Sequence, residues 1–128
     1  MAYYKTRLFK RKIKHTGLSD ASLLNAAKEV ESGLHDGDLG GGVIKKRIAI
    51  KNVGKRGGAR TIIFFKSGSH VFFVDGWEKK DVPKSSKEIE EDVLETYKDL
   101  ASAFLSYSEA DIAALLKRGI LSEVKEVK

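Results

Sequence analysis

The sequence of 128 residues has no cysteine and only one proline. Without cysteine the chain has no disulfide scaffold, no thiol nucleophile and no zinc site built on thiolates. A chain without cysteine suits a reducing compartment, so we expect a soluble cytoplasmic protein. The basic residues 1–15 are not followed by the apolar run of about 7–15 residues that a signal peptide needs. No later stretch reaches the roughly 18 apolar residues of a membrane span, so we expect no membrane contact.

Acidic residues are missing from two long segments of the chain. Residues 1–15 contain six lysines and arginines and no acid, and residues 45–66 contain eight and no acid. Over the whole chain 24 lysines and arginines against 18 acidic residues give a net charge of +6. Positive charge concentrated in blocks favours a polyanionic partner, with nucleic acid as the first candidate. We therefore expect the basic part of the chain to form one face of the molecule.

Apolar residues at helical spacing predict three helices. The first begins at an N-cap, Ser19 or Asp20, and ends at Gly33. A long amphipathic helix is expected to begin after Ser86. A shorter helix over residues 109–118 is expected to be capped by Ser108 and to end at Gly119. With 41% hydrophobic residues the chain has material for one core, so we predict a single domain over residues 1–128.

Three β-branched and aromatic runs, residues 43–51, 59–66 and 70–77, predict an antiparallel meander. The segment before them, residues 35–42, is rich in glycine and is expected to be a loop. Residues 2–9 are typical of either a short edge strand or the start of a basic helix. The C-terminal tail is typical of either a short strand or a frayed end. We predict an α+β fold with a small twisted antiparallel sheet of three to four strands and the helices on one face.

The expected strand over residues 43–51 concentrates cations on one of its faces. Alternation places Lys45 and Arg47 together, about 7 Å apart along the strand, and points Lys46 the other way. Arg60, at the start of the next strand, is within reach of this pair and suits a bidentate grip on a phosphate. An ordinary solvated sheet face explains the same pattern, so both interpretations stay open at this point.

A loop that joins the first two strands adds Lys55 and Arg56 among three glycines. Glycine has no Cβ, so backbone amides and side chains can both approach a phosphate there. The loop lacks the spacing of a nucleotide-binding P-loop and the helix that should follow it. Its cations therefore favour an RNA backbone over a nucleoside triphosphate.

Cleavage of RNA without a metal needs a base for the ribose 2′-hydroxyl, cations for the phosphorane and an acid for the 5′-oxygen. Of the three histidines only His70 lies close to the basic strands, where a structural role is the commoner one. Lysines crowded by other cations favour the neutral amine and are the remaining candidates for proton transfer. Asp36 and Asp38 suit turn formation better than Mg²⁺ binding, so we expect no metal or other cofactor. Trp77 suits a core position better than a stacking platform.

Residues 38–49 (DLGGGVIKKRIA), 54–63 (GKRGGARTII) and 72–80 (FFVDGWEKK) resemble a RelE/HigB-like branch of the RelE/ParE toxin superfamily. The likeness extends to residues 121–124 and so covers nearly the whole chain. The resemblance implies a RelE-like fold and a metal-independent endoribonuclease that cuts mRNA in the ribosomal A site. It also implies a cognate antitoxin as partner. Some members have a catalytic tyrosine or histidine near residues 82–86, where this chain has neither.

The resemblance places the family's paired strand cations at Lys45 and Arg47, its phosphate-gripping arginine at Arg60 and a later basic residue at Lys80. Our hypothesis makes Lys45 the general base, the two arginines the transition-state clamps, and Lys80 or Lys79 the acid. The resemblance leaves two rivals open, a ParE-like gyrase poison and a non-catalytic RNA-binding module. The residues expected to bind RNA are Lys46, Lys51, Lys55, Arg56 and Lys79.

Overall fold

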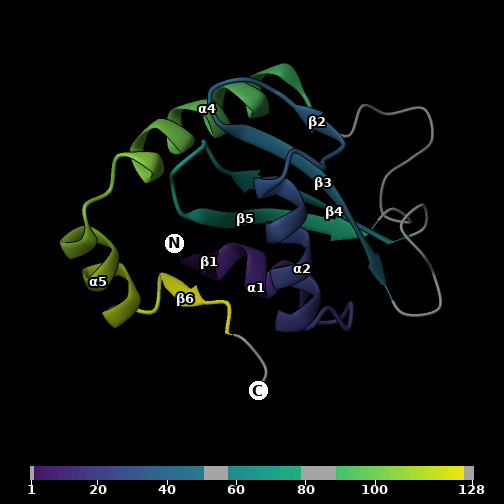
Figure 1. Ribbon diagram of the computed structural model, residues 1–128, viewed down its shortest axis with the longest axis horizontal. Coiled ribbons are helices and arrows are strands. Elements are labelled where there is room, and N and C mark those ends of the chain that lie inside the picture. Colours follow the sequence, from purple (N-terminus) through teal and green to yellow (C-terminus); the bar gives the residue numbers. More distant parts are fainter. Residues whose placement is uncertain (1, 51–57, 79–88, 126–128) are drawn as a thin grey trace.

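A six-stranded mixed sheet, in the order β2-β3-β4-β5-β1-β6, forms the centre of the computed structural model (Figure 1). The structure describes residues 2–50, 58–78 and 89–125. Within these ranges the chain also forms four helices. The elements in chain order are β1 (Tyr3–Thr6), α1 (Arg7–Ile13), α2 (Asp20–Glu31), β2 (Gly37–Asp38), β3 (Val43–Ile50), β4 (Gly58–Phe64), β5 (Val71–Glu78), α4 (Glu91–Leu105), α5 (Glu109–Lys117) and β6 (Leu121–Glu123).

The predicted antiparallel meander is confirmed as β3, β4 and β5. β3 and β4 pair without interruption from Val43 opposite Phe64 to Ile48 opposite Ala59. The pairing of β4 with β5 shifts between Ile62 and Ile63, which places an extra residue in β5. Such a bulge changes the face to which the following side chain points.

The sheet is larger than the three to four strands that the sequence predicted. Residues 2–9, predicted as either a strand or the start of a helix, belong to both, because β1 runs directly into α1. β1 is not an edge strand: it pairs in parallel with β5 and antiparallel with β6 (Figure 1). Residues 37–38, expected in a loop, pair with β3 as the short strand β2. The two pairings of β1 join segments far apart in the chain, which local patterns do not reveal.

Helices cover both faces of the sheet, so the prediction of helices on one face was wrong. We call the two sides the α2 face, which α1 and α2 cover, and the α4 face, which α4 and α5 cover. Strands buried on both faces are apolar without alternation, as β4 is. On the α2 face the buried strand residues include Ile44, Ile48, Ile63, Val71 and Phe73, and on the α4 face they include Tyr4, Val43, Ile62, Phe64, Phe72, Val74 and Leu121.

Two of the three expected helix starts are confirmed by their caps. The Ser19 hydroxyl accepts a hydrogen bond from the Ser22 amide at 3.2 Å, and Ser108 forms a capping box at the start of α5. The long helix α4 begins later than expected, with Glu90 at its N-cap, and Ser86 lies outside the described residues. No helix in the described ranges has the length and apolar character to cross a membrane.

Candidate active site

Three cations of the meander share the α4 face. Arg47 lies directly opposite Arg60 across the antiparallel pair of β3 and β4, and Lys45 lies opposite Ile62. Residues directly opposite each other in such a pair point to the same face, and Ile62 packs against the helices of the α4 face. The register therefore confirms that Lys45, Arg47 and Arg60 lie on one side of the sheet.

The three side chains differ in their access to solvent. The Arg47 side chain is 41% exposed, and Lys45 is half-buried. Arg60 is only 1% exposed, although we expected it to line an open cationic surface. A phosphate can therefore reach Arg47 directly in this conformation, whereas Arg60 lies beneath its neighbours.

Arg47 is held in place by the loop that precedes β2. The Asp36 carboxylate accepts a hydrogen bond from the Arg47 backbone amide at 2.7 Å, and its other oxygen lies 3.8 Å from the Arg47 Nε. Asp38 accepts a hydrogen bond from the Gly40 amide at 2.9 Å, which confirms its expected role in a turn. The Asp36–Arg47 ion pair is long, and the Arg47 Nε is buried without a hydrogen bond in the described part of the chain, so the partly exposed side chain remains available to another anion.

Lys46 does not belong to this group of cations, so its place among the expected RNA-binding residues needs correction. Its side chain enters the α2 face, where Lys46 is 4% exposed. The ammonium group lies 3.0 Å from the Glu29 carboxylate and donates to the Leu34 carbonyl at 3.0 Å. A buried lysine needs such partners to offset its lost hydration, so Lys46 anchors β3 to the end of α2.

Asp75 is a residue of this face that the sequence interpretation missed. It lies opposite Ile62 on β5, and the bulge turns its side chain to the α4 face beside Val74. The Tyr97 hydroxyl of α4 donates a hydrogen bond to one of its oxygens, and Lys12 of α1 lies 2.8 Å from the other. Strict alternation would place Asp75 on the opposite face, so only the bulge could have revealed it.

The Asp75 carboxylate keeps Tyr97 protonated. Burial raises the pKa of Tyr97, and the hydrogen bond to Asp75 and the negative charge of Asp75 raise it further. A phenol held in this way is a poor proton donor or base near neutral pH. Asp75, Lys12 and Tyr97 therefore join β5, α1 and α4 beside the cations, and Tyr97 is not a candidate for proton transfer.

Trp77 of β5 lies opposite Arg60 of β4 in the strand register. It packs against the apolar cluster of the α4 face. It is half-buried, and its indole Nε1 is buried without a hydrogen-bond partner in the described part of the chain. Trp77 thus contributes to the core, as expected.

His70 does not belong to this group of cations. His70 accepts a hydrogen bond from the Ala2 amide at 3.0 Å and lies 2.8 Å from Glu109, which is the structural role expected of it. In the described ranges no three His, Asp or Glu side chains lie close enough to hold a metal ion. The remaining candidates, Lys51, Lys55, Arg56, Lys79 and Lys80, lie outside the described residues.

The family model described as the RelE toxin of the RelE/RelB toxin–antitoxin system matches residues 1–124. A comparison with curated proteins found no match. The matched residues include every described strand and helix and both arginines of the candidate site. The chain therefore belongs to the RelE toxin family.

Proposed function

We propose that the protein is the toxin of a toxin–antitoxin pair and a ribosome-dependent, metal-independent mRNA endoribonuclease. One observation carries the proposal: Arg47 and Arg60 lie directly opposite each other on the α4 face, with Lys45 beside them. Guanidinium groups on the same face of two paired strands can hold one phosphodiester, which fits their donor geometry.

In the proposed reaction the ribose 2′-oxygen attacks the adjacent phosphorus, and the bond between phosphorus and the 5′-oxygen breaks. The products are a 2′,3′-cyclic phosphate and a 5′-hydroxyl. Lys45 takes the proton of the 2′-hydroxyl, and Arg47 and Arg60 stabilise the charge of the phosphorane. Lys80, or Lys79 beside it, gives a proton to the departing 5′-oxygen.

The burial of Arg60 adds a requirement to this mechanism. A guanidinium that is 1% exposed meets a phosphate only after the groups above it move. Arg47 is exposed and makes the first contact, and Arg60 then completes the clamp. The requirement for the ribosome fits this order, because binding energy from a large surface can drive a local rearrangement that a short RNA cannot.

The proposed partners are a cognate antitoxin protein and the ribosome with mRNA in its A site, in the cytoplasm. Lys51, Lys55, Arg56 and Lys79 are proposed to bind RNA outside the scissile phosphate. Lys46 is left out because Glu29 neutralises it on the other face. The antitoxin matches the family description, which names a toxin–antitoxin system.

The proposal is tested with purified ribosomes programmed with a defined mRNA, with cuts mapped by primer extension. Arg47→Ala and Lys45→Ala should each lower the cleavage rate by roughly 10²–10³-fold, the usual effect of losing one group that stabilises a transition state. Arg60→Lys keeps the buried charge but not the bidentate grip, so its rate should also fall while the protein stays folded. Lys66→Ala, an exposed lysine just beyond β4, is the control and should cut at the wild-type rate.

Three results would contradict the proposal. Full cleavage by both Lys45→Ala and Arg47→Ala would remove the catalytic role of this face. DNA breaks with intact mRNA in cells that express the toxin would indicate a gyrase poison of the ParE kind. Salt-sensitive binding to ribosomes without any cleaved product would indicate a module that binds RNA without cutting it.

A further inference from the structure

Asp36, the residue before β2, makes two backbone contacts with β3. Its amide donates to the Lys45 carbonyl at 2.9 Å, and its carboxylate accepts a hydrogen bond from the Arg47 amide at 2.7 Å. The register of β2 on β3 ends with Gly37 opposite Lys45, so the Arg47 amide lies beyond the partner strand. The carboxylate there accepts the hydrogen bond that a longer β2 would accept through a backbone carbonyl. Asp36 therefore fixes the edge of β3 on both sides of Lys46.

The second oxygen of the Asp36 carboxylate faces the Arg47 guanidinium group. It lies 3.8 Å from Nε, which is too long for a hydrogen bond. The Nε atom is buried and has no hydrogen-bond partner in the described part of the chain, although the Arg47 side chain is 41% exposed. A phosphate from solvent therefore meets the terminal Nη1 and Nη2 donors and not Nε. The carboxylate restrains the inner end of the guanidinium group and leaves the outer end for an anion.

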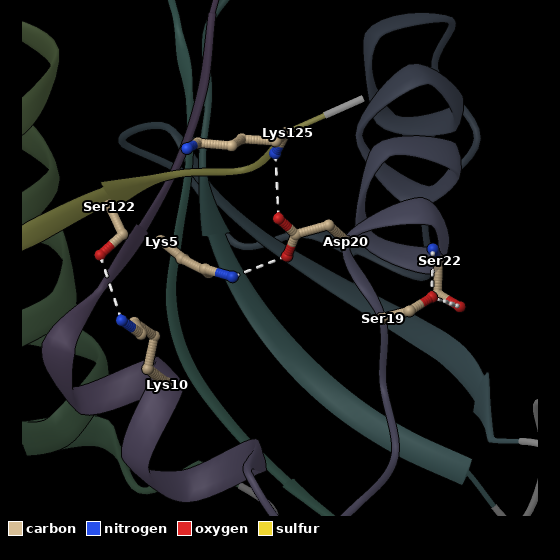
Figure 2. Close-up of polar contacts among 7 residues, drawn as sticks. All are labelled: Lys5, Lys10, Ser19, Asp20, Ser22, Ser122 and Lys125. Carbon is tan, nitrogen blue, oxygen red and sulfur yellow. Dashed lines mark hydrogen bonds and ion pairs between the residues drawn. The ribbon is translucent and has the colours of Figure 1, made fainter. Parts of the chain in front are cut away.

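A closed ion pair of the same design occurs at Asp20 (Figure 2). One Asp20 oxygen accepts a hydrogen bond from the Lys125 amide at 3.0 Å, and the other lies 2.6 Å from the Lys5 Nζ. That contact is short enough for a charge-assisted hydrogen bond, and the Lys5 side chain is only 16% exposed. Both carboxylates thus hold a backbone amide with one oxygen and attract a cation with the other. Only Asp20 engages its cation fully, because the contact of Asp36 with Arg47 is longer and more exposed.

A neutral acceptor would complete the edge of β3 without acting on the guanidinium group. An asparagine can accept the Arg47 amide, but it carries no charge that attracts an arginine side chain. A carboxylate at position 36 does both. The proposed reaction depends on where Lys45 and Arg47 lie, and a displacement of about 1 Å at such groups lowers a rate by up to roughly 10²-fold.

We infer that Asp36 is a positioning residue for the scissile phosphate. It fixes the strand edge that carries Lys45 and Arg47, and it orients the Arg47 guanidinium group so that Nη1 and Nη2 meet the phosphate. This inference rests on the proposed function, because it takes Lys45 and Arg47 as the residues that act on RNA. Asp36 itself touches neither the RNA nor the reacting atoms.

The test measures kcat and KM for cleavage of mRNA on programmed ribosomes. Asp36→Ala should lower kcat by about 10–100-fold, because the strand edge and the guanidinium group both lose their restraint. KM should change little, since the lysines proposed to bind RNA are untouched. Asp36→Asn keeps an acceptor for the Arg47 amide and loses only a long ion pair, so its kcat should stay within about fivefold of the wild type.

Asp38→Asn is the matched control. It removes the same charge from the same turn and keeps an acceptor for the Gly40 amide, so it should cut at the wild-type rate. Equal losses in Asp36→Ala and Asp38→Asn would show that the turn needs only its negative charge and would overturn the inference.

A double variant separates positioning from a general loss of stability. If Asp36 acts through Arg47, Asp36→Ala should lower kcat far less in the Arg47→Ala background than in the wild type. The same factor in both backgrounds would overturn the inference, as would full activity of Asp36→Ala.

Hydrogen exchange in the free protein supplies a readout that needs no ribosome. Exchange of the Arg47 amide, followed by NMR, should be on the order of tenfold faster in Asp36→Ala than in the wild type, and unchanged in Asp36→Asn. Unchanged exchange in Asp36→Ala would mean that the carboxylate does not hold β3. A wild-type protein with a protected Arg47 amide that never cuts mRNA would instead contradict the proposed function and leave this contact standing.

Discussion

At the scale of single residues, the cations of the molecule differ in their burial and in their ion-pair partners. Lys46 and Arg47 are neighbours in the chain, yet one is buried against Glu29 and the other is 41% exposed beside Arg60. The alternation of a strand produces this difference. A cation buried against a carboxylate holds the fold together, whereas an exposed cation with only a long ion pair is able to attract a further anion. Net charge alone does not separate the two roles.

Tyr97 gives a residue-scale prediction about stability. Tyr97→Phe removes the hydrogen bond to the buried Asp75 and should lower the free energy of unfolding by about 1.5–3 kcal/mol, the usual value for a bond to a charged group. Because the pKa of Tyr97 is raised above its ordinary value of 10.0, its contribution is complete below pH 10.0 and declines as the pH rises beyond it. Urea unfolding of both proteins between pH 7 and about 11 measures this.

Tyr107→Phe is the control, because no hydrogen bond of the Tyr107 hydroxyl occurs in the described part of the chain. It should leave the midpoint of unfolding nearly unchanged. If the gap between wild type and Tyr97→Phe is absent at neutral pH, or stays constant above pH 10, the hydroxyl does not interact with Asp75 as described.

At the scale of elements, the turn before β3 positions the strand that carries Lys45 and Arg47. Three successive glycines, Gly40 to Gly42, have positive φ angles between 64° and 91°. L-residues with a side chain rarely adopt this conformation. The turn also lies against α4, because a Cβ at Gly42 would come within 2.5 Å of a methyl carbon of Leu105. The glycines therefore let β3 begin directly beneath α4.

Gly42 and Gly68 form a matched pair that tests this packing. Their φ angles are +86° and +85°, but a Cβ at Gly68 meets nothing within 4 Å. Gly68→Ala should cost about 1–2 kcal/mol of stability, from backbone strain alone. Gly42→Ala should cost about 1–3 kcal/mol more, because the methyl group overpacks the contact with Leu105. Thermal or urea unfolding measures both variants.

A double variant shows whether the contact with Leu105 causes the difference. Gly42→Ala combined with Leu105→Ala should lose less stability than the sum of the single changes, because the clash disappears with the larger side chain. Equal costs for Gly42→Ala and Gly68→Ala would instead mean that Leu105 moves aside freely.

At the scale of the whole molecule, the two ends of the chain complete the sheet. β6 pairs with β1, so Tyr4 lies opposite Glu123, and the Val124 amide donates to the Tyr3 carbonyl at 2.9 Å. Leu121 packs into the core of the α4 face and Val124 into that of the α2 face. The C-terminal segment therefore links both cores to the N-terminal strand.

Truncation tests this role of the C-terminus. A protein that ends at Ile120 loses β6 and two buried side chains, each worth about 1.5–3 kcal/mol, so its free energy of unfolding should fall by about 3–6 kcal/mol. The amides of β1 should then exchange hydrogen faster. A protein that ends at Lys125 keeps every described contact and serves as control. The same unfolding midpoint for both truncations would show that β6 contributes little.

Sequence patterns predicted the parts of the fold that depend on neighbours in the chain. Ser19 and Ser108 were identifiable as caps because capping acts within one turn. The meander followed from β-branched and aromatic runs separated by turns. β1 and β6 were ambiguous because a short strand is stable only beside a partner, and that partner lies more than a hundred residues away in the chain.

The sequence by itself determined that Lys45 and Arg47 share a face, because the period of two is a property of the strand. Only the tertiary structure decided what surrounds them. The strand register places Arg60 opposite Arg47, and the surrounding elements bury Arg60. Glu29 of α2 forms an ion pair with Lys46 on the other face, and a bulge turns the Asp75 side chain toward Tyr97. Local geometry follows from the order of residues, whereas burial and ion pairing depend on which distant segments pack together.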